Sequence, residues 1–523
     1  MTRLDRRDFL TLAAGAAFTA CGGAARAGTG DGPIVATRLG RVRGRAEAGI
    51  RIFTAIPYGR AARFAAPRPA LAWRDILDAT RPAAVAPQPP GPMPREGRMS
   101  EDCLQLNIWA PSGPGPYPVY FYIHGGGNET GWSGDAGHAG DRFAAHDVVC
   151  VTANYRVGAL GYLELGELLG AHWAGSGNNG MRDILLALRW VRANIAAFGG
   201  DPARITIAGE SAGGKNVAAL MGMPAADGLY ARAAIYSGGG ETVLPPQEAR
   251  EVARLYAGKL GGAARLRTAP VEAILAAQAA AKAAWPRNYP FRAMVDGATL
   301  PQAPLERVAA GRAPRVPLLI GTNADESRLF LTPEQAAGPL LPHYIANENM
   351  ARMKALDAAY ARAFPTLSVA ERHWRLMTAE EYGMPCLRLA EGHAAHGAPV
   401  YRYRLTYPAP GGAFAGHSPH VLDVPFTFDH ATQPGFAALF GLSAADQPFA
   451  DTVHRAVIRF VAGGAPAAPR LPAWRGYEAM RRETMVLSHH STLDSDPDRV
   501  ERLIWAGASA RTPGAAATVR SRA

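Results

Sequence analysis

Gly209-Glu210-Ser211-Ala212-Gly213 follows an apolar run at residues 204–208 and precedes an expected helix. A serine at a tight strand-to-helix turn needs neighbours without bulk, and Gly209 and Gly213 meet that need. The turn places the hydroxyl at the N-terminus of the helix, where free NH groups and the helix dipole favour developing negative charge. The pattern therefore predicts a strand, a sharp turn and a helix, with Ser211 as a nucleophile at the turn.

A second glycine-rich motif, His124-Gly125-Gly126-Gly127, ends the apolar run at residues 118–123. Consecutive glycines let backbone NH groups approach a substrate closely, in conformations that other residues avoid. With the NH of the residue after the nucleophile, such groups hold the oxyanion of a tetrahedral intermediate. We therefore expect the NH groups of Gly126, Gly127 and Ala212 to form an oxyanion hole.

A serine hydroxyl needs a base to become a nucleophile, and the base needs an orienting acid. Two carboxylates, Asp325 and Glu326, follow one predicted strand. Two histidines, His417 and His420, follow another. Open α/β sheets place their sites beyond the ends of such strands. The residues alone leave both carboxylates and both histidines open as the acid and the base.

Continuous apolar runs alternate with segments of helical periodicity through most of the chain. Such runs are typical of strands buried on both faces, and their alternation with helices predicts a mostly parallel sheet. The expected strands are residues 118–123, 147–153, 204–208, 231–236, 316–321 and 400–406. The expected helices include residues 180–199, 448–463 and 496–506. The sequence therefore predicts an α/β fold, with a mostly parallel central sheet flanked by helices.

Three segments depart from this alternation. Residues 330–396 lack a strand pattern and predict an inserted helical subdomain, a usual place for a pocket lid. Residues 81–98 are rich in proline and glycine and predict a long surface loop. Residues 508–523 are expected to be a loose tail, so the folded domain is expected to span residues 28–507.

Composition excludes several classes of protein. Of the 523 residues, 48% are hydrophobic and 19% charged, which excludes disorder as the main state. The net charge is +11, but it comes from scattered arginines, and only four residues are lysines. No basic stripe interleaves with aromatic residues, so we expect no nucleic-acid partner. Without a CxxC or HExxH pattern, we expect no metal and no cofactor.

The N-terminal residues 1–27 are expected to be a twin-arginine export signal, because Arg6 and Arg7 precede a short apolar stretch. Ala25-Arg26-Ala27 fits a peptidase site that would release a soluble protein, whereas Cys21 follows an imperfect lipobox and would carry a lipid anchor. The apolar stretch is too short to span a bilayer, and no later one is long enough, so we expect no transmembrane segment. Both routes predict an exported protein, periplasmic or secreted.

Several ordered motifs together resemble the type B carboxylesterase and cholinesterase family of α/β-hydrolases. They include EDCLQLN at 101–107, HGGG at 124–127, NYR at 154–156, FGGDP at 198–202 and GESAG at 209–213. The likeness covers roughly residues 33–507 and implies the α/β-hydrolase fold. It also implies a serine carboxylesterase that cleaves a small-molecule ester through an acyl-enzyme intermediate.

The resemblance assigns one role to each candidate. It makes Ser211 the nucleophile, Glu326 the acid and His420 the base, with Asp325 as the alternative acid. The family's histidine stands three residues before a carboxylate, which is true of His420 and not of His417.

The resemblance assigns supporting roles as well and marks departures. It implies that Glu210 is a charge near the histidine and that Ser237 supports the triad by hydrogen bonds. The family's cysteine at position 103 usually pairs with an upstream cysteine, which is absent here, so Cys103 is expected to be a free thiol. Asn128 stands where phenylalanine is frequent. Met93 stands where cholinesterases carry a choline-binding tryptophan, so choline esters are poor candidates.

Two alternatives stay open beside ester hydrolysis. The same catalytic residues suit an amide, a carbamate, or a bulky polyester or toxin ester. A non-catalytic cholinesterase-like binding protein is the other reading, although such proteins typically lose the serine. The sequence does not predict the oligomeric state.

Overall fold

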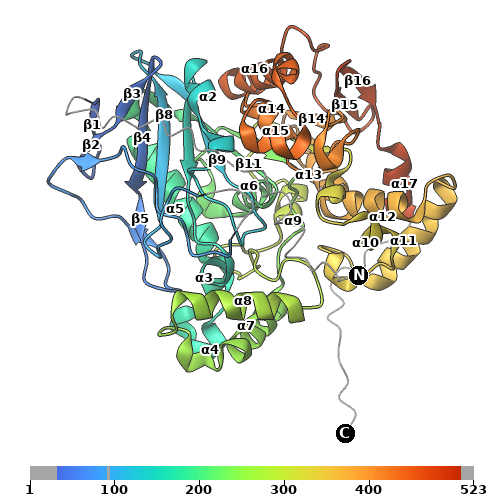
Figure 1. Ribbon diagram of the computed structural model, residues 1–523, viewed down its shortest axis with the longest axis horizontal. Helices are drawn as coiled ribbons and strands as arrows, with labels where there is room; N and C mark the ends of the chain where they lie inside the picture. Colours follow the sequence, from blue (N-terminus) through green and yellow to red (C-terminus); the bar gives the residue numbers. More distant parts are fainter. Residues whose placement is uncertain (1–31, 91–94, 508–523) are drawn as a thin grey trace.

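The computed structural model of the protein describes residues 32–90 and 95–507 (Figure 1). The expected export signal at residues 1–27 and the expected tail at residues 508–523 lie outside the described residues.

The centre of the fold is an eleven-stranded sheet in the order β16-β15-β14-β13-β12-β11-β9-β10-β8-β4-β3. Strands from β10 to β15 in this order pair in parallel, whereas β3, β4 and β8 at one edge and β16 at the other are antiparallel to their neighbours. The strands are β3 (Arg45–Glu47), β4 (Ile50–Pro57), β8 (Gln105–Pro111), β9 (Tyr117–Ile123), β10 (Val149–Ala153), β11 (Gly200–Glu210), β12 (Arg232–Tyr236), β13 (Leu318–Asn323), β14 (Val400–Leu405), β15 (Glu483–Leu487) and β16 (Thr492–Ser495). The prediction of a mostly parallel sheet is confirmed.

Five further short strands form two small sheets near the N-terminal edge. They are β1 (Ile34–Ala36), β2 (Arg41–Arg43), β5 (Gly59–Arg60), β6 (Arg68–Pro69) and β7 (Leu77–Asp78).

Strand β9 shows why its residues form one continuous apolar run. Val119, Phe121 and Ile123 pack into the core on one face of the sheet. Tyr120 and Tyr122 pack into a second core on the opposite face. Because successive side chains of a strand point to opposite faces, a strand covered on both sides needs an apolar residue at every position.

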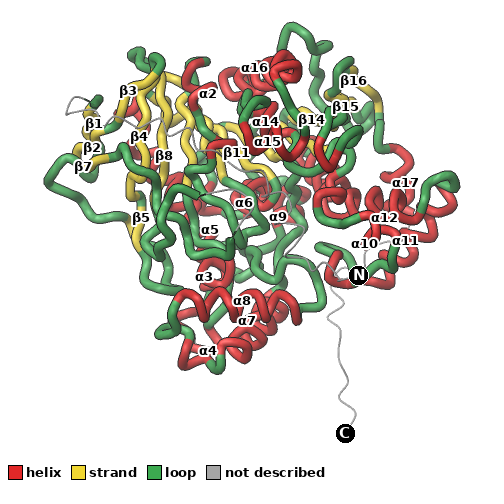
Figure 2. Tube along the Cα trace, viewed as in Figure 1, coloured by secondary structure: helices red, strands yellow, loops and turns green. Residues whose placement is uncertain are grey.

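Helices cover both faces of this sheet (Figures 1 and 2). On one face, α5 (Asn179–Asn194), α6 (Ala212–Gly222) and α13 (Met384–Ala394) contact the strands, and α9 (Pro304–Ala309) packs on α6. On the other face, α2 (Asp141–Ala145) and α16 (Gln447–Gly463) contact the strands, and α14 (Asp423–Thr427) packs on α16. The remaining helices of this part are α3 (Gly158–Tyr162), α4 (Gly166–Leu169), α7 (Pro246–Leu260), α8 (Val271–Ala284) and α15 (Pro434–Phe440).

Residues 330–396 form a helical layer beside the sheet, drawn in yellow and orange in Figure 1. It contains α10 (Pro333–Ala337), α11 (Met350–Ala363), α12 (Val369–Thr378) and a π-helical turn, η9 (Ala379–Gly383), that leads into α13. The last helix, α17 (Arg499–Gly507), packs on α11, and Trp505 Nε1 donates a hydrogen bond to the Tyr360 hydroxyl at 2.9 Å. The segment is helical, as the sequence predicts, and its role as a lid stays a prediction.

Composition predicts that the proline-rich segment at residues 81–98 is a surface loop, but part of this segment is buried. Val85 and Gln88 are buried, at 0% and 1% exposure. The Gln88 side chain exchanges two hydrogen bonds with Gly131, donating to its carbonyl at 2.9 Å and accepting from its NH at 2.8 Å. Proline and glycine signal an irregular backbone, but they do not signal whether side-chain hydrogen bonds satisfy that backbone in the interior.

The cysteines at 103, 150 and 386 are buried, and each is a free thiol. This confirms the expectation that Cys103 is a free thiol. Burial raises the pKa of the Cys103 and Cys386 thiols to about 12.

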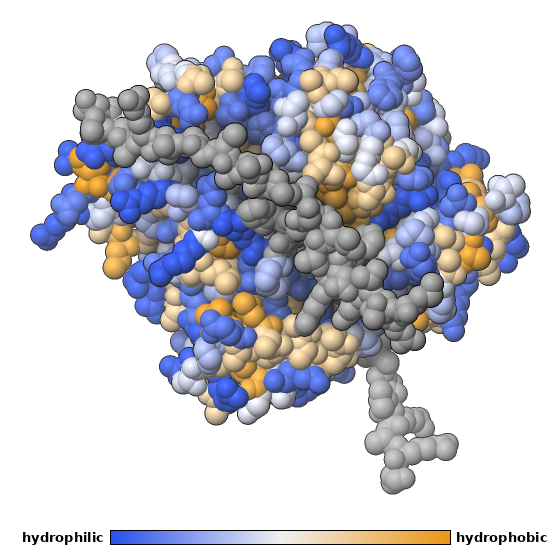
Figure 3. All heavy atoms as spheres, viewed as in Figure 1, coloured by the Kyte–Doolittle hydropathy of each residue, from blue (hydrophilic) through white to orange (hydrophobic). Residues whose placement is uncertain are grey.

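The surface of the described residues is mixed. Polar and apolar side chains are interspersed on the face that Figure 3 shows. Within residues 32–90 and 95–507, no helix combines the length and apolarity needed to cross a bilayer.

A buried ion pair supports the strand ends that carry the site. Arg156 follows β10 and lies with Asp183 of α5 in the interior, with side-chain exposures of 4% and 0%. The guanidinium donates two hydrogen bonds to the carboxylate, at 2.7 and 2.8 Å. We expect Asp183→Asn to lower the free energy of unfolding by about 3–5 kcal/mol, because it leaves a buried arginine without a counter-charge. Urea unfolding of the variant checks this, and a loss below about 1 kcal/mol contradicts it.

Candidate active site

Ser211 occupies a strained turn between β11 and α6. Its φ is 57°, in the left-handed region that residues with side chains rarely adopt. A Cβ added to Gly213 would lie 2.0 Å from the carbonyl oxygen of Ile123, and one added to Gly209 would lie 2.4 Å from the carbonyl carbon of Gly213. No side chain fits at either position, so the two glycines allow the turn to press against the end of β9.

The glycine-rich loop after β9 passes directly beside the serine. A Cβ added to Gly125 would lie 3.0 Å from the Cβ of Ser211. Gly126 and Gly127 have φ values of 99° and 65°, which glycine adopts without strain. Ala212 is the first residue of α6, and the first NH groups of a helix have no intrahelical acceptor. The structure therefore brings the three expected oxyanion-hole residues to one place, next to Ser211.

A second group of buried side chains lies at the ends of β12 and β13. Glu326 is 0% exposed, and its Oε2 lies 2.5 Å from His420 Nδ1. Its Oε1 accepts hydrogen bonds from the Ser237 hydroxyl at 2.6 Å and from the Asn323 NH at 2.7 Å. These contacts fix the carboxylate and hold a proton on Nδ1 of His420, which leaves Nε2 free to accept a proton.

The alternative acid and the alternative base lie apart from this group. His417 Nδ1 lies 4.0 Å from Asp325 Oδ2, and their side chains are 39% and 32% exposed. Asp325 also accepts a hydrogen bond from the Ser418 NH at 2.9 Å. The two therefore face each other near the surface, whereas Glu326 and His420 are buried together.

Glu210 contacts the catalytic candidate His420 directly. Its Oε1 lies 3.1 Å from His420 Nε2, with side-chain exposures of 5% and 2%. The angle does not suit a hydrogen bond, and among the described residues neither atom has another hydrogen-bond partner. Burial raises the pKa of Glu210. Burial alone would lower the pKa of His420, but Glu210 and Glu326 outweigh it and raise that pKa to about 9.

The sequence did not single out three aromatic and charged neighbours of this site. Tyr382 and Phe330 lie with ring centres 4.7 and 5.0 Å from the ring of His420. Lys215 lies one helical turn after the serine on α6. Their positions come from the packing of segments distant in sequence, which no local pattern reports.

A small pocket, with a cavity volume of about 10 Å³, lies beside the expected oxyanion-hole residues. Its lining includes Gly127, Ala212, Lys215, Asn216, Thr242 and Tyr289. It is mixed in polarity and shares Gly127 and Ala212 with the expected oxyanion hole.

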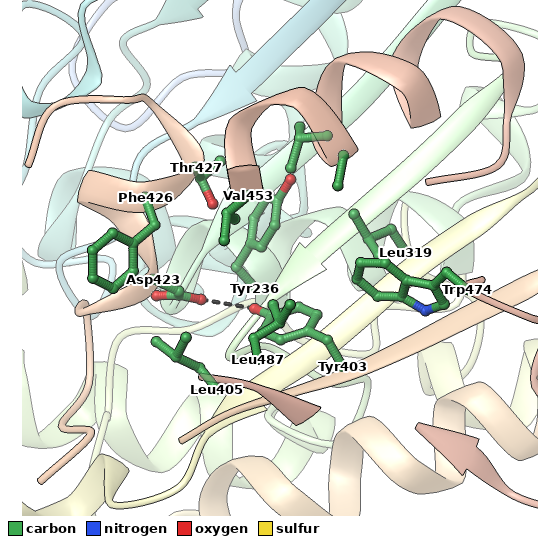
Figure 4. Close-up of a pocket in the computed structure, with 12 residues that line it drawn as sticks. Tyr236, Leu319, Tyr403, Leu405, Asp423, Phe426, Thr427, Val453, Trp474 and Leu487 are labelled. Atoms are coloured by element: carbon green, nitrogen blue, oxygen red, sulfur yellow. Dashed lines mark hydrogen bonds between the residues drawn. The ribbon is translucent and has the colours of Figure 1, made fainter. Parts of the chain in front are cut away.

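A second pocket, with a cavity volume of about 20 Å³, lies on the opposite face of the sheet (Figure 4). Tyr236, Leu319, Tyr403 and Trp474 line it, and the Tyr403 hydroxyl donates a hydrogen bond to Asp423 at 2.7 Å. These side chains belong to the second core or pack against it, and none of the expected oxyanion-hole residues lines this pocket, whereas Gly127 and Ala212 line the other one. We therefore place the substrate in the pocket beside the oxyanion-hole residues.

Within residues 32–90 and 95–507, no group of three or more histidine, cysteine, aspartate or glutamate side chains is arranged to hold a metal ion.

The mostly parallel sheet, with a serine on a strained strand-to-helix turn, defines an α/β-hydrolase. The carboxylesterase family profile matches residues 31–503. This chain belongs to the carboxylesterase family and is a type B carboxylesterase.

Comparisons with characterised relatives agree with this membership. The para-nitrobenzyl esterase of Bacillus subtilis is 34% identical over 492 residues, which cover 90% of this chain and 97% of that protein. The fumonisin B1 esterase of Sphingopyxis macrogoltabida is 29% identical, with 84% of each chain covered. A crystal structure of a Geobacillus stearothermophilus carboxylesterase matches with a TM-score of 0.79 and 35% identity, covering 90% of this chain and 99% of that one.

Proposed function

We propose that the protein hydrolyses small carboxylic esters through a Ser211–His420–Glu326 triad and an acyl-enzyme intermediate. The observation that carries the proposal is the buried hydrogen-bonded chain from Ser237 through Glu326 to His420. This chain reaches the strained serine turn through Glu210, the residue before Ser211, whose Oε1 lies 3.1 Å from His420 Nε2. A nucleophile, an oriented base and a set of NH donors are the parts that acyl transfer requires.

The proposed reaction has two symmetrical halves. His420 Nε2 accepts the hydroxyl proton of Ser211 as Oγ bonds to the ester carbonyl carbon, and the carbonyl oxygen takes up the negative charge. The NH groups of Gly126, Gly127 and Ala212 stabilise that charge. The intermediate collapses, the C–O bond to the alcohol breaks, and His420 returns the proton to the leaving oxygen. Water then attacks the acyl-enzyme by the same route and releases the acid and free Ser211.

Hydrolysis of p-nitrophenyl esters with acyl chains of increasing length tests this proposal. We expect turnover of short chains and a fall in kcat/KM where the acyl chain exceeds the pocket. A phosphonate ester should add one covalent group, and peptide mass spectrometry should place it on Ser211. A folded enzyme that neither turns over the esters nor accepts the label contradicts the proposal.

The same arrangement suits other acyl bonds, so the leaving group has to be measured. The relatives include a phenmedipham hydrolase of Pseudarthrobacter oxydans, 30% identical over 482 residues. A matched ester, carbamate and anilide of one acid separate ester cleavage from the alternative of amide or carbamate cleavage. We expect the ester to have the largest kcat/KM, because its alcohol leaves without needing protonation as early as an amine does.

The contact between Glu210 and His420 predicts a pH dependence. Catalysis needs a neutral His420, and two carboxylates raise the pKa of that imidazole above its usual 6.5, to about 9. The acid limb of kcat/KM should therefore lie above pH 6.5, with activity lost as the pH falls through it. In Glu210→Gln one negative charge is removed, so the limb should move down by about one pH unit. An exposed control, Glu478→Gln, should leave it in place, and an unmoved limb in Glu210→Gln contradicts the assignment.

We also propose that the protein is exported. Arg6, Arg7 and the apolar stretch after them support a twin-arginine signal. Replacing both arginines by lysine should retain the protein in the cytoplasm of a bacterium that has this pathway, as cell fractionation measures. Fatty-acid labelling that is lost in Cys21→Ala would establish a lipid anchor, whereas a mature N-terminus at Gly28 would establish release.

A further inference from the structure

Lys215 forms an ion pair close to the nucleophile. Its backbone NH donates to the Ser211 carbonyl at 2.9 Å, one turn earlier on α6. Its ammonium lies 2.7 Å from Glu381 Oε1, and 4.6 and 4.9 Å from the ring centres of Tyr289 and Tyr382. We call Lys215, Glu381, Tyr289 and Tyr382 the Lys215 cluster. The side chains of the ion pair are 9% and 5% exposed, so solvent hardly screens it.

The Lys215 cluster also touches the proposed base. Glu381 and Tyr382 are consecutive residues of η9, the π-helical turn of the helical layer. The ring of Tyr382 lies 4.7 Å from the ring of His420, with 35° between their planes. Tyr382 is completely buried, and its hydroxyl has no aligned hydrogen-bond partner among the described residues. Its contact with His420 is therefore made by the ring, and the ion pair anchors the turn that carries that ring.

Lysine is unusual at position 215, because most basic residues of this chain are arginines. Only four of the 55 basic residues are lysines, so arginine is the usual cation here. A compact ammonium with three donors fits between two ring faces and one carboxylate, whereas a planar guanidinium is larger.

We infer that Lys215 and Glu381 are a positioning pair for ester hydrolysis. Their ion pair fixes η9, so that Tyr382 holds the ring of His420 in place, and the ammonium offsets the field of the Glu381 carboxylate at that ring. This inference rests on the proposed triad, because it assigns the pair its effect through His420.

Several charged groups face His420 from the elements around it. They are Glu210 at the end of β11, Glu326 after β13, Asp423 of α14 and Glu381 of η9, and Lys215 of α6 is paired with Glu381. The negative charge of Glu381 favours the charged imidazole and so raises the pKa of His420. A positive charge on Lys215 acts in the opposite direction, as it does on Glu210. Removing one partner should therefore shift the titration of His420, and removing both should largely restore it.

The experiment measures kcat and KM against pH for Lys215→Met, Glu381→Gln and the double variant. In Lys215→Met the acid limb of kcat/KM should move up by about one pH unit, and in Glu381→Gln down by a similar amount. At the pH optimum of each single variant, kcat should fall about 10- to 100-fold relative to the wild type. KM should change little, because the substitution displaces His420 and does not fill the substrate pocket. The double variant replaces a buried pair by neutral side chains, which generally preserves folding. Its acid limb should return close to that of the wild type.

Two controls are needed. One separates the charge of Lys215 from the shape of its side chain, and the other tests whether loss of any ion pair lowers kcat. Lys215→Arg keeps the charge, so its acid limb should stay in place even where kcat falls. Lys282 pairs with Glu129 at 2.9 Å but is 45% exposed, and Lys282→Met should change kcat less than about threefold.

The outcomes distinguish this inference from the triad. Normal phosphonate labelling of Ser211 in all variants, with acid limbs that do not move, would overturn the positioning pair and leave the triad intact. Absence of the label on Ser211 in the wild type would overturn the triad and the inference with it. Opposite shifts in the two single variants, with recovery in the double variant, support the inference.

Discussion

Ser211→Ala is expected to lower kcat by about 10⁶-fold and to leave the fold unchanged. The serine hydroxyl is the group that would form the acyl-enzyme, and no neighbouring side chain can replace it in the strained turn. Alanine is smaller than serine at a position that is 9% exposed, so the substitution removes an oxygen without adding a clash. The oxyanion-hole NH groups remain, which accounts for the small rate that should persist above that of water.

Initial rates with p-nitrophenyl acetate, together with circular dichroism and a thermal melt, check this result. A Tm within about 2 °C of the wild type shows that lost activity is not lost folding. Activity within tenfold of the wild type would mean that another group performs the attack, and it would contradict the assignment of Ser211 as the nucleophile.

His420→Ala and His417→Ala form the second prediction, a matched pair separated by three residues. His420 is buried against Glu326, so its loss removes the base and leaves a buried carboxylate without its partner. We expect kcat to fall by about 10⁵- to 10⁶-fold. His417 is 39% exposed and faces Asp325, so its loss should change kcat less than about threefold.

The assays described for Ser211→Ala are applied to both variants. They give kcat and the thermal melt of each variant. The thermal melt of His420→Ala shows whether the carboxylate left in the interior destabilises the fold. Equal losses of kcat in the two variants, with both folded, would contradict the choice of His420. A large loss in His417→Ala alone would make Asp325 and His417 the acid and the base.

The fold was predictable from the sequence where local sterics decide it. The turn at Ser211 needs small neighbours, and the run that became β9 is apolar at successive positions because helices cover both faces. The C-terminal edge of the sheet was harder to predict, because β15 and β16 are short and contain charged residues. Burial of Gln88 could not be predicted either, because its hydrogen bonds are made with Gly131, more than forty residues away.

The candidate site divides in the same way. Ser211, Gly126 and Gly127 stand in contiguous motifs, whereas the pairing of Glu326 with His420 could be reached only through a family pattern. The contact between Lys215 and Glu381 spans 166 positions and joins α6 to a turn in the helical layer. No local sequence pattern predicts a contact between residues so far apart, so only the three-dimensional structure shows it.

The buried thiols at positions 103, 150 and 386 can report where the folded protein opens. Burial raises the pKa of each thiol above its usual value, so little thiolate forms in the folded enzyme. Because the thiolate is the reactive form, alkylating reagents should modify the folded enzyme slowly. Each thiol becomes reactive only when the core around it opens. Cys103 and Cys386 lie in the core on one face of the sheet and Cys150 in the core on the other, so the order of alkylation would reveal which half of the molecule opens first.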